Sequence, residues 1–284
     1  MIRHRLTFIT PLFSRGSYDH LPEIRPASIR GQLHWWFRAL GGSAADENAI
    51  FGSVHSKPVL ASKIVVRVGE IQGQTGEMNT LPHKNGTQAS PKACFKPGAS
   101  FGLIITERLG GLDERLRKAF HRTLETWLLI GTLGLRSTRA GGSFVWTPES
   151  EGAFTQPPTV DAYRTRITEL LKGAPLKAVL LSGPDKVLGA EDVRRIISDT
   201  LGGRDDKAGE NDLTRLNHPL GKIQPRKTSP LRFRIVQIGT CFHIVAMWDD
   251  RNTVTGNRQG DLQGVIDLLA TRGKQIGKLL QGQI

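Results

Sequence analysis

The sequence is short of cysteine and of long apolar runs. Its 284 residues include two cysteines, Cys94 and Cys241, in unrelated contexts, so neither a disulfide framework nor a cysteine zinc site is available. No run of about 18 apolar residues exists and no basic amphipathic helix stands at a terminus, so we expect no membrane partner. Residues 1–10 alternate polar and apolar side chains, unlike a signal segment, and we expect a cytoplasmic protein.

Carboxylates are scarcer than cations. The 39 lysines and arginines outnumber the 26 aspartates and glutamates and give a formal net charge of +13. This imbalance is far from that of a typical metabolic enzyme and indicates a polyanionic partner. Because a membrane is disfavoured, the charge predicts binding to RNA or DNA.

Short strands and amphipathic helices alternate in the first half. Period-two alternation and β-branched residues predict strands at residues 5–13, 59–71, 99–107 and 143–147. Helical spacing predicts a helix at residues 28–40, with Ser28 as a candidate N-cap, and another at 113–130, capped by Asp113. The order β-α-β-β-α-β is that of the ferredoxin-like (RRM-like) unit.

The second half repeats part of this order. It contains predicted strands at residues 177–181, 231–238 and 241–248, and predicted helices at 191–201 and 261–280. A fourth strand is missing from the pattern. Two segments rich in Gly, Pro, Asn, Lys and Asp, residues 72–98 and 203–229, are expected to be long loops.

Residues 148–158, which include a Pro-Pro pair, form the natural boundary between the halves. We therefore predict an α+β protein built from tandem ferredoxin-like domains with long loop insertions. The first domain spans residues 1–150 and contains a glycine-rich loop. The second, divergent domain spans residues 151–284.

A basic stripe follows the predicted helix at residues 28–40. Arg30, His34 and Arg38 recur at i, i+4 and i+8 beside an apolar sector that contains Trp36. Trp35 falls outside that sector. We expect it to cover a neighbouring subunit, to offer its ring to a base or a guanidinium, or simply to pack beneath a loop.

The start of this helix is suited to anion binding. Arg25, Ser28 and Arg30 surround free backbone N–H groups and the positive end of the helix dipole, which favour a phosphate. Alternatively, Arg25 forms a surface ion pair with Glu23 or Asp19.

Residues 131–143 form the most unusual segment, with four glycines, two arginines and no carboxylate. Such a loop can bring backbone N–H groups and guanidinium forks close to phosphates. It is not a P-loop, because the spacing GxxxxGK is absent and the segment follows a helix and precedes a strand. A flexible connection with incidental charge is the alternative. The candidate RNA contacts here are Arg136, Ser137, Thr138, Arg139, Gly141 and Gly142.

A second run of cations without a carboxylate comprises Lys222, Arg226, Lys227, Arg232 and Arg234. We interpret the first three as candidate phosphate contacts, which give sequence-independent and salt-sensitive affinity. The alternative is a solvated strand and loop face, with Arg232 and Arg234 directed outward from the strand.

Three segments together resemble a known family. Residues 10–13 (TPLF), 25–40 (RPASIRGQLHWWFRAL) and 50–53 (IFGS) are similar to the opening of the RAMP superfamily of CRISPR effector proteins. They most closely resemble the first subunit of the type III-B Cmr complex. Residues 134–144 resemble the glycine-rich loop of that family, which joins the last helix and strand of a ferredoxin-like domain. The motifs cover roughly the first half of the chain.

The resemblance implies a non-catalytic, RNA-binding subunit at one end of a multi-subunit ribonucleoprotein for antiviral defense. It implies binding to the CRISPR guide RNA near its 3′ end, a contribution to recognition of the complementary target RNA, and contact with other Cmr subunits. It also implies that a different, backbone-forming subunit cleaves the target. We expect no cofactor and no metal in this subunit.

Two other functions stay open. Several RAMP proteins resemble metal-independent RNA endonucleases with a histidine base, and His20 with Tyr18 and Arg25 is the best candidate set here, although no spacing enforces it. Two carboxylate pairs, at residues 205–206 and 249–250, lack a His or Glu at ligand spacing, which argues against metal catalysis. A general single-stranded nucleic-acid binder is the other alternative, although the aromatic strand signature of RRM proteins is absent.

Overall fold

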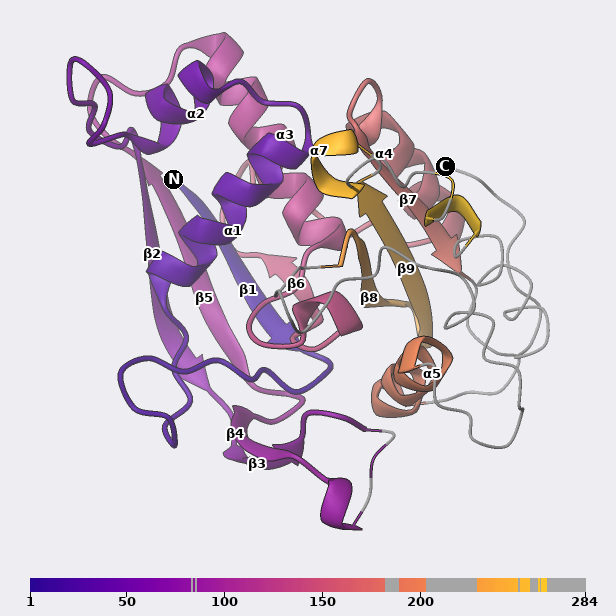
Figure 1. The fold of residues 1–284 in the computed structure, drawn as a ribbon. Coiled ribbons are helices and arrows are strands. Elements are labelled where there is room, and N and C mark those ends of the chain that lie inside the picture. The colour runs from indigo at the N-terminus through magenta and orange to yellow at the C-terminus, as the bar shows by residue number, and fades with distance from the viewer. Residues whose placement is uncertain are drawn as a thin grey trace.

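The computed structural model describes residues 1–82, 84, 86–181, 189–202, 229–249, 251–255, 260 and 262–264. The first half contains β1 (Ile2–Phe8), α1 (Pro26–Ala39), α2 (Ala44–Phe51), β2 (Ile64–Gln72), β3 (Thr75–Asn79), the 3-10 helix η1 (Gly86–Gln88), β4 (Pro91–Phe95), β5 (Ser100–Glu107), α3 (Glu114–Ile130), the 3-10 helix η2 (Ser137–Arg139) and β6 (Phe144–Pro148) (Figure 1). The second half contains α4 (Val160–Leu171), β7 (Leu176–Leu181), α5 (Ala190–Gly202), β8 (Leu231–Ile238), β9 (Cys241–Asp249) and α7 (Asn252–Thr255).

The first half folds around an antiparallel sheet in the order β2-β5-β1-β6. Central β1 pairs with β5 on one side and with β6 on the other, so Leu6 lies between Phe101 and Trp146. The last strand therefore lies beside the first, as the β-α-β-β-α-β order requires. This arrangement confirms the predicted α+β class.

Two amphipathic helices, α1 and α3, pack side by side over this sheet (Figure 1). Asp113 caps α3 as predicted, because its carboxylate accepts a hydrogen bond from the N–H of Leu116 at 2.7 Å. The predicted Ser28 cap of α1 is wrong. Helix α1 begins earlier, since Pro26 occupies its first turn and Arg25 is the N-cap residue, without a side-chain hydrogen bond.

The prediction of an irregular loop at residues 72–98 is also wrong in part. Strands β3 and β4 form an antiparallel hairpin there, with Gly76 opposite Cys94. The hairpin lies between β2 and β5 in the chain but forms a separate two-stranded sheet. Helices α2 and α4 were not predicted either. Both begin at residues whose side chains cap the helix, Ser43 for α2 and Thr159 for α4.

The second half contains an antiparallel three-stranded sheet in the order β7-β9-β8, with α5 packed against it. Within the described residues this sheet has no fourth strand. The predicted helix at residues 261–280 falls almost wholly outside the described part of the chain. A second ferredoxin-like unit and the boundary at residues 150 and 151 therefore stay predictions.

One hydrophobic core spans both halves. It joins Trp127 and Phe144 of the first half to Tyr163 and Met247 of the second. The hydroxyl of Tyr163 donates a hydrogen bond to the carbonyl of Leu129 at the end of α3. Within the described residues, no helix is both long and apolar enough to cross a membrane.

Arg234 on β8 lies at the junction between the halves. Its side chain is 1% exposed and donates hydrogen bonds to the carbonyls of Trp127, Gly131 and Phe144. Burial lowers its pKa to about 10, so it stays charged at neutral pH. The expectation that Arg234 is directed outward is wrong, because its guanidinium points inward and donates to buried carbonyls just after α3 and in β6.

Candidate nucleic-acid interface

The basic stripe of α1 is partly covered by α2. Arg30 donates a hydrogen bond to the carbonyl of Phe51 at the end of α2. The Nδ1 atom of His34 lies 2.6 Å from the Glu47 carboxylate, and an Arg38 N–H donates to the same oxygen at 3.1 Å. Glu47 is nearly buried, whereas 57% of the Arg38 side chain is exposed. Of the three basic side chains, Arg38 is therefore the one with most of its surface free for a polyanion.

At the start of α1, Arg25 and Ser28 are both exposed. The Nε atom of Arg25 lies 4.0 Å from a carboxylate oxygen of Glu23, which is the surface ion pair considered as the alternative. An exposed pair of this kind contributes little to stability and is easily exchanged for a phosphate. RNA contact by these two residues stays a prediction.

Trp35 packs on the protein itself. The Arg232 guanidinium of β8 lies 3.9 Å from the centre of the Trp35 ring, which also contacts Trp36 edge to face. Burial lowers the pKa of Arg232 to about 10. The ring thus meets a guanidinium, one of the expected partners, and the contact fastens α1 to β8. The expectation of a solvated Arg232 is wrong.

The glycine-rich segment is a tightly bonded turn. Arg136 and Ala140, on either side of η2, have left-handed backbone angles, with φ of 62° and 60°. The N–H groups of Gly141 and Gly142 donate to the carbonyls of Arg136 and Pro11, at 3.1 and 2.9 Å. A Cβ atom on Gly142 would lie 2.0 Å from the carbonyl oxygen of Leu133. These glycines therefore permit close packing, and the expectation that their N–H groups face a phosphate is wrong.

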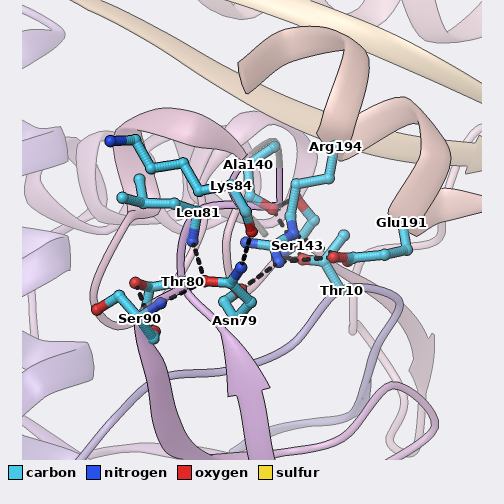
Figure 2. Close-up of polar contacts among 10 residues, drawn as sticks. All are labelled: Thr10, Asn79, Thr80, Leu81, Lys84, Ser90, Ala140, Ser143, Glu191 and Arg194. Atoms are coloured by element: carbon cyan, nitrogen blue, oxygen red, sulfur yellow. Dashed lines mark hydrogen bonds and ion pairs between the residues drawn. The ribbon is translucent and has the colours of Figure 1, made fainter. Parts of the chain in front are cut away.

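Both halves of the protein hold this turn in place. The Thr10 hydroxyl donates to the carbonyl of Ala140 at 2.7 Å, and the Ser143 hydroxyl donates to the same carbonyl at 3.0 Å (Figure 2). The N–H of Ala140 donates to the carbonyl of Phe233 on β8 at 3.1 Å. The segment is consequently a rigid platform, which contradicts the alternative of a flexible connection.

The two arginines of the turn lie at different depths. Arg136 is exposed and has no carboxylate partner among the described residues. Arg139 is half-buried and donates to the carbonyls of Thr138 and Leu231, at 3.1 and 3.5 Å. Burial and the adjacent Arg136 charge lower the pKa of Arg139 to about 10, and partial burial with the charge of Arg194 lowers that of Arg136. Cations that repel one another in this way favour an anion beside them.

Arg194 on α5 is the third guanidinium of this group, and the sequence analysis missed it. It is 1% exposed, donates to the Asn79 carbonyl at 2.9 Å, and bonds the Glu191 carboxylate at 2.6 and 2.8 Å (Figure 2). The Asn79 side chain in turn accepts from the N–H groups of Leu81 and Ser90. Arg194 thus joins α5 to the hairpin beside the glycine-rich turn.

A cleft of about 350 Å³ opens next to the turn. Its walls come from residues 13–20 after β1, from the β3–β4 hairpin, and from Leu135. Arg15 and Lys92 lie among its walls, and Arg15 pairs with Asp19 at 2.9 Å. Sequence patterns could not reveal this cleft, because two of its walls belong to segments without a clear element pattern.

The remaining candidates are the second run of cations and the candidate catalytic set. Lys222, Arg226 and Lys227 lie outside the described residues. Of the candidate catalytic set, His20 lines the cleft and Tyr18 lies beside it, with ring centres 6.0 Å apart. Among the described residues, no group of three or more His, Cys, Asp or Glu side chains is placed to hold a metal ion.

Comparison with known proteins shows the family. The RAMP superfamily model matches residues 5–145. The CRISPR system Cmr subunit Cmr1-2 of Pyrococcus furiosus is 41% identical over 169 residues, which cover 49% of this chain and 90% of that protein.

Solved structures share the fold. The apo crystal structure of Cmr1 from Pyrococcus furiosus gives a TM-score of 0.60 at 21% identity and covers 87% of each chain. A chain of the type III-B Cmr-β complex bound to cognate target RNA gives 0.56 at 10% identity, covering 93% of this chain and 99% of that one. The chain therefore belongs to the RAMP superfamily and, within it, to the Cmr1 subunits of the type III-B CRISPR system.

Proposed function

We propose that this chain is a non-catalytic, RNA-binding subunit of a type III-B Cmr ribonucleoprotein in the cytoplasm. It binds the guide RNA near its 3′ end, contributes to recognition of the complementary target RNA, and contacts other Cmr subunits. Its relative is a Cmr subunit, and the Cmr-β complex that shares its fold is bound to cognate target RNA. Both findings support the proposal.

One observation carries the RNA-binding part. The rigid glycine-rich turn presents exposed Arg136 without a carboxylate partner among the described residues, next to Arg139 and Arg194. Glu191 is bonded to Arg194, so it does not neutralise the other two guanidinium groups. A fixed backbone lowers the entropy lost when a phosphate is bound. The arrangement suits contact with a phosphate backbone without selection of sequence.

Replacing Arg136 by alanine tests this function. We expect weaker binding of single-stranded guide RNA of any sequence, and a plot of log K against log salt that is shallower by about 0.7 for each lost phosphate contact. The measurement is fluorescence anisotropy over a salt series. Lys118→Ala is the matched control, because it removes an equally charged, 77% exposed side chain from α3. An unchanged slope in Arg136→Ala would remove the turn from the RNA site.

A guide-processing ribonuclease is the second candidate, favoured by the exposed His20 ring in a cleft that also contains Arg15 and Lys92. His34 is the less suitable base, since its Nδ1 atom is bonded to Glu47. The discriminating experiment incubates the chain with repeat RNA in EDTA. Specific cleavage that His20→Ala abolishes and His34→Ala retains would establish the nuclease and displace the first proposal.

A further inference from the structure

A short hairpin after β1 carries exposed aromatic rings at its tip. Arg15 and Pro22 pair across the base of the hairpin, and the N–H of Leu21 donates to the carbonyl of Tyr18 at 3.3 Å to close the turn. Tyr18 is 64% exposed, and its ring centre lies 6.0 Å from that of exposed His20. Packing within the protein does not account for the position of Tyr18, because a large ring is normally buried where the fold allows it.

The cleft beneath this tip has the lining of a base-binding site. Phe13, Ala93 and Leu135 provide apolar surface. Its charged groups are of both signs, since Arg15 and Lys92 are accompanied by Asp19 and Glu77. A phosphate gains little where cations and carboxylates balance, whereas the edge of a nucleobase has both donors and acceptors to match them.

The size of the cleft agrees with this chemistry. Its volume of about 350 Å³ lies at the lower end of the range for small-ligand sites, roughly 300–1,000 Å³. The space suits one nucleotide. A flat base would find apolar surface from Phe13, Ala93 and Leu135 and the ring of His20, beside which Tyr18 lies.

The cleft is continuous with the proposed phosphate contact. The N–H of Leu135 donates to the carbonyl of Phe13 at 2.7 Å, which fixes one cleft wall against another. Arg136 directly follows Leu135, a residue of the cleft wall, so the proposed phosphate contact and the cleft belong to the same turn. Separate binding of backbone and base is the usual division in single-strand recognition.

We infer that the cleft lined by Phe13, His20 and Leu135 binds one unpaired base of single-stranded RNA, stacked on His20 and the adjoining Tyr18 ring, while Arg136 contacts a neighbouring phosphate. This inference rests on the proposed RNA-binding function and adds a base-stacking site to it. The stacked base is held by ring contact and by polar groups of both signs, so different bases are accepted.

The test uses guide RNA oligonucleotides that carry 2-aminopurine at one position each, because stacking quenches its fluorescence. We expect one position to be quenched on binding to the wild-type chain. In Tyr18→Ala that quenching disappears and affinity falls about 10-fold, the size of one lost base–aromatic stack. Tyr18→Phe keeps both, since stacking does not need the hydroxyl. Leu21→Ala, which shortens another exposed side chain of the same hairpin, leaves both unchanged.

The outcomes separate this inference from the proposed function. If guide RNA binds with an Arg136-dependent salt slope but no position depends on Tyr18, the base site is wrong and the proposed function stands. If no salt-sensitive binding of guide RNA occurs, both are wrong. If Tyr18→Ala keeps its RNA affinity and loses a Cmr subunit on reconstitution, the cleft is a protein contact and the base site is overturned.

Discussion

His4 is fully buried in β1, and its ring is held on one side. The Nε2 atom accepts a hydrogen bond from the N–H of Phe154 at 3.0 Å, and the two rings stack with centres 6.1 Å apart. Within the described residues, Nδ1 has no hydrogen-bond partner. Burial lowers the pKa of His4 to about 4, so the neutral ring is the one that fits the folded protein.

Lowering the pH should therefore destabilise the protein through His4. The His4 ring takes up a proton near pH 6.5 in the unfolded chain but only near pH 4 in the folded protein. The free energy of unfolding therefore has its full value above pH 6.5 and decreases as the pH falls toward 4, because protonation then favours the unfolded chain. We expect a loss of about 2 kcal/mol in the free energy of unfolding between pH 7 and pH 5. Urea titrations at the two pH values measure it.

The control for this prediction is His4→Gln, which keeps an acceptor near Nε2 and does not titrate. Its free energy of unfolding should vary less between the two pH values. Some variation remains, because burial also lowers the pKa values of His121 and His243. The same pH dependence in His4→Gln as in the wild type would exclude His4 as its source.

Individual residues were predictable where their partners lie nearby in the chain. Asp113 caps α3 three residues before the N–H that it accepts. Arg30 and His34 looked free because their partners, Phe51 and Glu47, belong to a helix that the sequence analysis did not predict. Arg234 looked solvated because its three carbonyl partners are about a hundred residues away in the chain. When the hydrogen-bond partner of a basic side chain is distant in the sequence, the residues around that side chain give no sign of it.

At the scale of elements, the short and polar ones were missed. Helix α2 has 8 residues, three of them Asp, Glu or Asn, and it buries few side chains. Strands β3 and β4 have 5 residues each and consist largely of polar or small side chains. Such segments gain stability from tertiary contact rather than from their own periodicity. The longer amphipathic elements around the main sheet were predicted, with their ends shifted by a few residues.

The β3–β4 hairpin should depend on Arg194. Replacing Arg194 by alanine leaves the Asn79 carbonyl without this donor and Glu191 without its ion pair, with an expected loss of about 2 kcal/mol. Hydrogen exchange should rise in the hairpin more than in β1. Arg195→Ala, an exposed arginine of the same helix, is the matched control. Equal exchange in the two variants would show that the ion pair does not hold the hairpin.

At the scale of the whole molecule, the two halves share a core and several long-range contacts. Their core is continuous, the glycine-rich turn is bonded to β8, and Arg232 and Arg234 extend from β8 to Trp35 and to the end of α3. The expected division near residue 150 reflects a real change in composition, but composition does not report which side chains are shared across a boundary. The glycine-rich turn, where we propose the RNA contact, therefore depends on both halves.

The stability of the whole chain should consequently depend on Arg234. Arg234→Met removes a donor from three buried carbonyls, of which that of Trp127 keeps the N–H of Gly131, and we expect a loss of about 3 kcal/mol. Arg232→Met is the control, because a methionine still covers Trp35 and the loss is limited to a cation–π contact of about 1 kcal/mol. Tryptophan fluorescence and far-ultraviolet circular dichroism during denaturation should give one coincident transition, since the core is shared. Two separate transitions would instead indicate that the halves fold independently. Equal losses in the two variants would show that the hydrogen bonds of Arg234 add nothing to its packing.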